Sequence, residues 1–343
     1  MTSAQSGRAR VGAVAIGRNE GERLVRCLES LLREGLLAVY VDSGSSDGSL
    51  AAARARGVVV VELDLTRPFT AARARNAGFA RLLELAPQLE FAQFVDGDCE
   101  LVEGWIARGL AALEAERDVV VVAGQRSERF PQASAYNRLC DMEWNTPVGE
   151  AEAVGGDALY RRAALEAVGG FDERLIAGEE PELCFRLRRA GGRVLRLPGA
   201  VTLHDAAMTR FSQWWTRTKR SGHAAAEAWA LHGAAGETQM VKIARSAVFY
   251  GVLAPLGSAL AALLSAFVAS PLWAAAPFAL LALVYLRLFA KVRAHRVERG
   301  DSAADAALYA RFTLLGKFAE SAGVFAFLAH RLRGKRARLI EYK

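Results

Sequence analysis

Cysteine is scarce in this 343-residue sequence, and its four cysteines lie far apart without a CxxC pair: Cys27, Cys99, Cys140 and Cys184. This spacing argues against a zinc framework or a disulfide scaffold and indicates the reduced thiols of a cytosolic domain. The first residues lack a long apolar run, so we expect no signal peptide. Helix-turn-helix, zinc-finger and RNP-type patterns are also missing. Despite a net charge of +7, we therefore expect no nucleic-acid partner.

Charged residues are missing from one long stretch. The 41 residues 246–286 contain no Asp, Glu, Lys or Arg, and one membrane-spanning helix needs about 20 apolar residues. Because Ser270-Pro271 interrupts the stretch, we predict a helical hairpin formed by residues 246–268 and 272–290. A buried two-helix core and a shallow re-entrant hairpin remain as alternatives.

Basic residues flank this hairpin on both sides: Lys242, Arg245, Arg287, Lys291, Arg293, Arg296 and Arg299. The positive-inside rule then puts both ends of the hairpin in the cytosol. The following segment, residues 303–333, is amphipathic and basic, and we expect it to lie along the membrane interface. Packing against the rest of the chain or against a second protomer is equally compatible, so an oligomer stays open.

The first 200 residues alternate strand and helix patterns, which predicts an α/β fold with a parallel, doubly wound sheet. Ligands of such sheets bind beyond the carboxyl ends of the strands. Polar clusters follow three of the predicted strands at these ends: Arg18-Asn19-Glu20, Asp42-Ser43-Gly44 and Asp96-Gly97-Asp98. We therefore expect a ligand site at this edge of the sheet.

The stretch "FVDGDCEL" places Asp96 and Asp98 two residues apart at the end of a predicted strand. Residues i and i+2 of an extended segment point to the same side, so the two carboxylates repel unless a cation neutralises them. Oxygen ligands suit a hard divalent ion, here Mg²⁺ or Mn²⁺. The alternative interpretation is a polar turn without a ligand.

Several motifs occur together in a characteristic order: "VDSGSSDGS" after the second strand, "ARNAG" at a helix start, the Asp96–Asp98 motif, and "GGDALYRRAALEAVGG" followed by "AGEEPELCFRL". Over residues 11–205 the chain resembles inverting glycosyltransferases of family 2. The resemblance implies a GT-A fold, a Rossmann-like nucleotide-sugar-binding domain. With the membrane segments it implies three parts: a catalytic domain (1–235), a two-helix transmembrane hairpin (236–295) and a basic amphipathic tail (296–343).

The resemblance also implies which residues bind the donor: Asn19, Glu20, Asp42, Arg73, Asn76, Asp96, Gly156 and Asp157. The first three are expected at the nucleotide, Arg73 and Asn76 at the nucleotide or its phosphates, and Gly156 and Asp157 at the donor sugar. Family members usually carry Asn where this chain has Asp157. The implied metal ligands are Asp96, Asp98 and His204.

The family's catalytic base corresponds to Glu180, whose carboxylate would take a proton from the acceptor hydroxyl. Its neighbours Glu179 and Glu182 leave the assignment open by one position. A charged helix start, with acids favoured by the helix dipole, is the alternative. For the acceptor, the resemblance and the order of motifs along the chain suggest Glu179, Gln213, Trp214 and Trp144.

The resulting interpretation is a metal-dependent inverting glycosyltransferase at the inner (cytoplasmic) membrane, multi-pass, with its catalytic domain facing the cytosol. Its donor would be a nucleotide-diphosphate sugar, with UDP-sugar expected. Its acceptor would be a lipid-linked saccharide or a membrane lipid in cell-envelope polysaccharide or glycolipid synthesis. The alternatives are a polyprenyl-phosphate sugar transferase of the same fold, a nucleotidyltransferase and a non-catalytic membrane scaffold.

Overall fold

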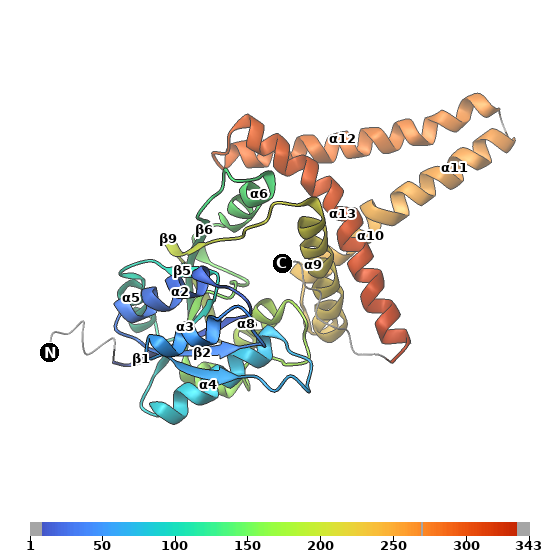
Figure 1. Cartoon of the computed structure of the whole chain (residues 1–343). Coiled ribbons are helices and arrows are strands. Elements are labelled where there is room, and N and C mark those ends of the chain that lie inside the picture. The colour runs from blue at the N-terminus through green and yellow to red at the C-terminus, as the bar shows by residue number, and fades with distance from the viewer. Residues whose placement is uncertain (1–8, 269, 335–343) are drawn as a thin grey trace. The chain divides into compact units, whose positions relative to one another are not determined.

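The computed structural model describes residues 9–268 and 270–334, which form two compact units (Figure 1). The first unit comprises residues 9–132 and 140–207, and the second comprises residues 133–139 and 208–334. The sequence placed the end of the catalytic domain at residue 235, whereas the first compact unit ends at Ala207. The predicted tail continues to residue 343, and its last nine residues, 335–343, lie outside the described part.

The first unit is built on one nine-stranded sheet in the order β3-β2-β1-β4-β8-β6-β9-β5, with β7 paired to β9. Strands β1 to β4 are parallel, whereas β8 runs antiparallel to both β4 and β6. The predicted α/β class is confirmed. The expectation of a parallel sheet holds for β1 to β4 and for the β6–β9 pair, whereas β5, β7 and β8 pair antiparallel with their neighbours. The strands are β1 (Val11–Gly17), β2 (Leu37–Asp42), β3 (Val59–Glu62), β4 (Phe91–Asp96), β5 (Cys99–Leu101), β6 (Val119–Glu128), β7 (Gly149–Glu150), β8 (Ala158–Arg161) and β9 (Arg193–His204).

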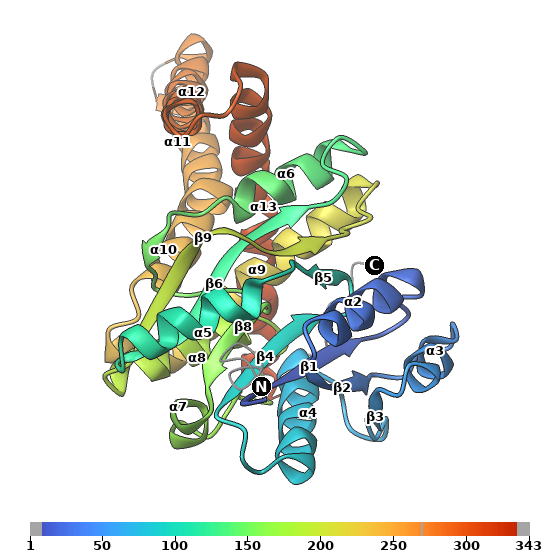
Figure 2. The ribbon, with the colours of Figure 1, turned by 90° about the vertical axis from the view of Figure 1, so that its left-hand side faces the viewer.

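Helices cover both faces of this sheet, because alternate residues of its strands are apolar on both sides. Ala13 and Ala15 of β1 pack into one core with α2, α3 and α5, while Val14 packs into a second core with α4 and α8. Figure 2 shows α2 and α4 on opposite sides of β1. The helices of this unit are α2 (Glu22–Arg33), α3 (Ser49–Ala55), α4 (Ala71–Leu85), α5 (Trp105–Ala115), α7 (Arg162–Ala167) and α8 (Glu179–Arg189), and α6 (Ala135–Trp144) is shared by both units.

The strand register brings the predicted polar clusters to one edge. Gly17 at the end of β1 pairs with Asp42 at the end of β2, and Ile16 pairs with Asp96 at the end of β4. The pattern of "FAQFVDGDCEL", residues 91–101, predicts one strand, and that prediction is wrong. The chain turns after Asp96, and β5 then pairs antiparallel with β9. A Cβ at residue 97 would lie 3.0 Å from the carbonyl oxygen of Ile16, so glycine suits this tight turn.

The second unit is helical. Its elements are α9 (Phe211–His232), η1 (Gly233–Ala235), α10 (Gln239–Val248), η2 (Phe249–Leu253), α11 (Ala254–Val268), η3 (Pro271–Ala274), α12 (Ala275–Glu298) and α13 (Ala303–Leu332). Helices α9, α10 and α12 pack against α13. The helices α9 and α13 approach so closely that a Cβ on Gly323 would lie 2.0 Å from the carbonyl oxygen of Lys219.

Three helical segments of the second unit are long and apolar enough to cross a membrane: Gln239–Val268, Pro271–Glu298 and Ala303–Leu332. The first two correspond to the predicted hairpin. The third was expected to lie along the interface. By length and composition it also qualifies as a membrane span. Two charged residues near its middle, Lys317 and Glu320, form an ion pair of 2.9 Å, and this pairing lowers the free-energy cost of placing them in lipid.

Candidate active site

The two aspartates of the turn after β4 have different surroundings. Asp96 accepts from Arg75 at 2.8 Å through one carboxylate oxygen and from Arg126 at 3.1 Å through the other. Asp98 faces His204, whose Nε2 lies 3.4 Å from its carboxylate. Burial opposes the ionisation of Asp96, but the charges of the two arginines outweigh it and hold its pKa below the usual value.

A single guanidinium connects Asp96 to the start of α8. Arg75 on α4 is buried, and its Nη2 lies 2.8 Å from Asp96 and 2.9 Å from Glu180. Its Nη1 donates to Glu179 at 2.8 Å. The structure therefore places both acids of the predicted catalytic loop beside the Asp96 carboxylate, with one cation between them.

Glu180 changes its protonation state near neutral pH. Burial first, and then the charge of Glu179, raise the pKa of Glu180 to about 7, against the lowering effect of Arg75. Its side chain remains 16% exposed, while that of Glu179 is 4% exposed. Near pH 7 Glu180 therefore exists in both protonation states, as a general base requires.

Asp157 is buried beneath this network. One carboxylate oxygen accepts from the backbone N–H of Asp96 at 3.0 Å, and the other accepts from Thr202 at 2.6 Å and pairs with Arg126 at 2.7 Å. These bonds fix the end of β4. At the preceding position, a Cβ on Gly156 would lie 2.4 Å from Nη2 of Arg75, so the Arg75–Asp96 pair needs glycine there.

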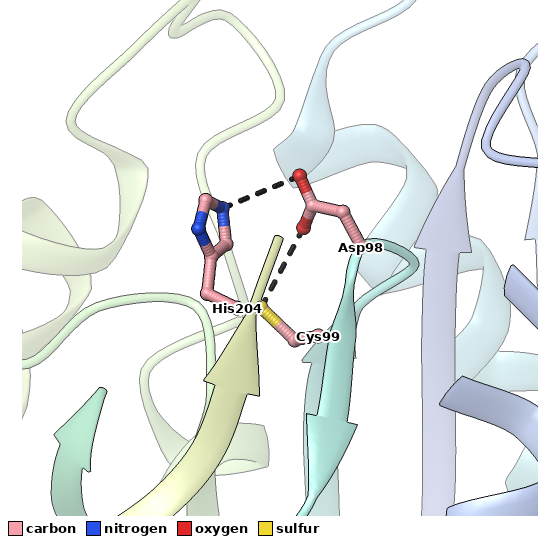
Figure 3. A group of neighbouring side chains, drawn as sticks. All are labelled: Asp98, Cys99 and His204. Carbon is pink, nitrogen blue, oxygen red and sulfur yellow. Dashed lines mark hydrogen bonds and ion pairs between the residues drawn. The ribbon is translucent and has the colours of Figure 1, made fainter. Parts of the chain in front are cut away.

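Figure 3 shows the cluster of Asp98, Cys99 and His204. Ligand atoms of these three buried residues all lie within 4.8 Å of one another. Nδ1 of His204 lies 3.0 Å from Glu128, which leaves Nε2 directed at Asp98. A carboxylate that orients a histidine in this way is typical of metal sites, and these residues fit a divalent cation.

The electrostatics of His204 agree with its placement among acids. Burial lowers its pKa, but the charge of Asp98 and the hydrogen bonds with Asp98 and Glu128 outweigh burial and raise it. A cation would supply the positive charge that this pocket of acids favours. A second group, Asp96, Cys99 and Asp157, also meets the 4.8 Å limit. In the described part of the chain, neither of these groups contains both aspartates of the motif.

Trp144, predicted at the acceptor, lies next to the metal ligand candidates. Its ring is 4.4 Å from the ring of His204, edge to face, and the guanidinium of Arg126 lies 5.2 Å from its centre. The tryptophan is partly exposed. Its position is compatible with stacking on a sugar, and that role stays a prediction.

The predicted nucleotide residues lie at the ends of β1 and β2. The carboxylate of Asp42 accepts from the backbone N–H groups of Gly44 and Ser45 at 2.8 Å each. Asn19 has a positive φ of 55° and accepts from the N–H of Ser46. Glu20 is buried and pairs with Arg23 at 2.8 Å. These bonds shape the two loops.

Arg73 and Asn76, predicted at the nucleotide or its phosphates, hold loops. Arg73 donates to the carbonyl oxygens of Asp64 at 2.8 Å and Arg67 at 3.0 Å. Asn76 donates to the carbonyl oxygen of Phe171 and accepts from its N–H. Their predicted contacts with the donor stay predictions.

Gln213 and Trp214 belong to the second unit. The side-chain oxygen of Gln213 accepts from the backbone N–H groups of Thr209 and Arg210 and so caps α9. Trp214 is 3% exposed, with its ring 4.8 Å from that of Phe312. Trp214 is thus buried among aromatic rings, whereas Gln213 is partly exposed, and the acceptor role of both stays a prediction.

Four residues of this site were not predicted from the sequence: Arg75, Arg126, Glu128 and Thr202. Arg75 stood inside the quoted "ARNAG" motif, between two residues that were selected, so a signal existed for it. The other three lie on β6 and β9, where only the pairing of distant strands brings them to the acids. The sequence contained no local pattern that could identify them.

Comparison with known proteins gives a consistent picture. Residues 14–169 match the family described as Glycosyl transferase family 2. The chain is 30% identical over 269 residues to the pre-mycofactocin glycosyltransferase of Mycobacterium tuberculosis, covering 74% of this chain and 54% of that protein. It is 24% identical over 226 residues to glycosyltransferase AglE of Haloferax volcanii, covering 62% and 72%. The chain thus spans about half the length of the mycobacterial relatives.

Among solved structures, the chain resembles the mannosyltransferase PcManGT from Pyrobaculum calidifontis, determined in complex with GDP-Man and Mn²⁺. The TM-score is 0.62 at 20% sequence identity, and the match covers 93% of this chain and 87% of that one. This likeness confirms the predicted GT-A fold with its C-terminal helices.

The close packing around Gly156 gives a first prediction. Substitution Gly156→Ala must displace the Arg75–Asp96 pair. We therefore expect the free energy of unfolding to fall by about 1–3 kcal/mol, a usual cost of overpacking. Gly155→Ala is the matched control, because a Cβ there meets nothing within 4 Å. Thermal and denaturant unfolding in detergent measure the difference, and equal stability of the two variants would contradict the prediction.

Proposed function

Because the chain belongs to glycosyl transferase family 2, we propose that it is a metal-dependent inverting glycosyltransferase. It moves a sugar from a nucleoside diphosphate-sugar to a hydroxyl acceptor. The observation that carries this proposal is the position of Glu180. It has a pKa of about 7 and is held 2.9 Å from Arg75 beside Asp96.

In this proposal Glu180 is the general base. Its carboxylate accepts the proton of the acceptor hydroxyl as that oxygen attacks the anomeric carbon of the donor sugar. The bond between the anomeric carbon and the nucleoside diphosphate breaks on the opposite side, which inverts the anomeric centre. Both acids pair with Arg75, but the side chain of Glu180 is 16% exposed and that of Glu179 only 4%, so we assign the base to Glu180 and not to its neighbour.

Asp98 and His204 are the residues proposed to hold a divalent cation, Mg²⁺ or Mn²⁺, with Glu128 orienting the histidine. When bound, such a cation offsets negative charge on the departing diphosphate. Asp96 was predicted as a third ligand. Both of its carboxylate oxygens already accept hydrogen bonds from arginines, so we favour Asp98 and His204 over Asp96 as metal ligands. The likeness to a structure containing Mn²⁺ supports a divalent ion.

Fewer observations support the identity of the donor and of the acceptor than support the type of reaction. The family resemblance favours a UDP-sugar, while the similar mannosyltransferase was solved with GDP-Man, so a donor screen should include both nucleotides. The apolar helices would confine the catalytic unit to a bilayer surface. We therefore propose a lipid-linked saccharide or a membrane lipid as acceptor. The basic flanks support an inner-membrane location with the catalytic unit in the cytosol.

Substitution Glu180→Gln tests the base. Removing it should lower turnover by about 100-fold or more, within the usual contribution of general base catalysis, while Arg75 can still donate to the amide oxygen. Glu182→Gln is the control on the same helix, since Glu182 pairs with Arg186. Release of nucleoside diphosphate and mass spectrometry of the product measure turnover with membrane or soluble extract as the acceptor source.

Three outcomes would contradict this account. Near-normal turnover of Glu180→Gln points to an acceptor that needs no base, such as a polyprenyl phosphate. Release of pyrophosphate points to a nucleotidyltransferase. No transfer or donor hydrolysis by the unsubstituted chain, with every nucleotide and metal tested, points to a non-catalytic scaffold.

Substitutions in the His204 cluster test the metal site without measuring activity. Asp98→Asn should abolish Mn²⁺ binding, and Glu128→Gln should weaken it about 10- to 100-fold, as losses of orienting groups usually do. The EPR signal of free Mn²⁺ during a titration measures the affinity. Asp118→Asn is the control because Asp118 is 54% exposed and contacts Arg193. Unchanged affinity in Asp98→Asn would place the ion elsewhere.

A further inference from the structure

The buried arginine of α4 has a contact pattern that donor binding alone does not explain. We infer that Arg75 is a positioning residue for the proposed base: it holds the Glu180 carboxylate in place and keeps it in a charged surrounding. This inference rests on the proposed function of Glu180. Arg75 was not among the site residues predicted from the sequence.

Both terminal nitrogens of the Arg75 guanidinium pair with carboxylates, which come from two elements. Nη2 lies 2.8 Å from Asp96 at the end of β4 and 2.9 Å from Glu180 at the start of α8. Nη1 donates to Glu179 at 2.8 Å. A planar fork can serve several acids at once in a fixed geometry, which a lysine ammonium cannot do. Arg75 therefore fixes α8 relative to the end of β4.

The surroundings of Arg75 restrict its motion. Its side chain is 2% exposed, and the ring of Phe171 lies 5.5 Å from its guanidinium carbon. Asp96, one of the acids bound to Arg75, also pairs with Arg126, and Arg126 pairs with Asp157. The base is thus the outer end of a chain of ion pairs, Glu180–Arg75–Asp96–Arg126–Asp157, whose other members are mostly buried.

Breaking the chain at Arg75 has a defined consequence. The groups that act on Glu180 are Glu179 on the same helix, Asp96 on β4 and Arg75 on α4. Tyr160 on β8 and Cys184 on α8 also interact with its charge, and both are neutral near pH 7, because burial raises the pKa of each. Arg75 is the cation of this set. Without it, two negative neighbours remain, and the pKa of Glu180 must rise further.

The test is the pH profile of kcat/KM for Arg75→Gln, Arg75→Lys and the control Arg186→Gln. The control removes an arginine from a Glu–Arg pair of the same helix that does not touch Glu180. For Arg75→Gln we expect the acid limb to move up by about one pH unit or more, the usual effect of losing an opposite charge at this distance. The loss of activity should then be about tenfold greater at pH 6 than at pH 8.5.

Arg75→Lys separates charge from geometry. Because the cation remains, its acid limb should stay near that of the unsubstituted chain. Its kcat should fall, since an ammonium cannot hold both acids of α8 in register, while KM for the donor should change little. This variant also covers the case in which Arg75→Gln leaves three buried acids unpaired and fails to fold.

Several results would overturn the inference. One is an Arg75→Gln protein that folds and loses activity equally at every pH. Another is a shift of the same size in Arg186→Gln. A third is an Arg75→Lys protein whose donor KM rises with kcat unchanged, which would make Arg75 a donor-binding residue. Full turnover of Glu180→Gln would overturn the proposed base itself and this inference with it. A loss in Glu180→Gln without a limb shift in Arg75→Gln would overturn the inference alone.

Discussion

One buried guanidinium shared by three carboxylates organises the catalytic unit. Buried acids are costly unless they are paired, and Asp96, Glu179 and Glu180 all meet at Arg75. The pairing brings the start of α8 to the edge where the parallel strands end. The acids still differ in protonation: two arginines hold the pKa of Asp96 below its usual value against burial, whereas burial and the charge of Glu179 raise the pKa of Glu180 to about 7 despite Arg75.

The turn at Gly97 gives the two aspartates different neighbours. Had the strand continued, both side chains would face the same side and compete for one cation. Because the chain turns and β5 pairs with β9, Asp98 joins His204 and Glu128, while Asp96 joins the arginines. The structure thus contains an ion-pair network leading to the proposed base, Glu180, and a separate cluster suited to a divalent ion. Asp157, bonded to the backbone of Asp96 and to Arg126, ties the network to β9 through Thr202.

Much of this architecture could be predicted from the sequence. Strand and helix patterns predicted the α/β class, and the polar clusters predicted which edge of the sheet carries the acids, because parallel strands align their carboxyl ends. The charge-free stretch predicted the helical hairpin. What failed depends on distant pairing. Strand β8 runs antiparallel to its neighbours, and the pairing of β6 with β9 brings Arg126 and Thr202 close to the acids. No local sequence pattern predicts which distant strands pair. For α13 the sequence predicted a position along the interface, because its apolar residues interleave with basic ones, and the helix also qualifies as a candidate span by length and composition.

The most direct measurement of the central claim is a structure of the chain in a lipid bilayer with Mn²⁺ and a non-transferable nucleoside diphosphate-sugar. The account predicts the ion on Asp98, His204 and the diphosphate. It also predicts the Glu180 carboxylate, still held by Arg75, on the side of the anomeric carbon opposite the diphosphate. An ion bound away from Asp98, or a Glu180 carboxylate on the same side as the diphosphate, would contradict it.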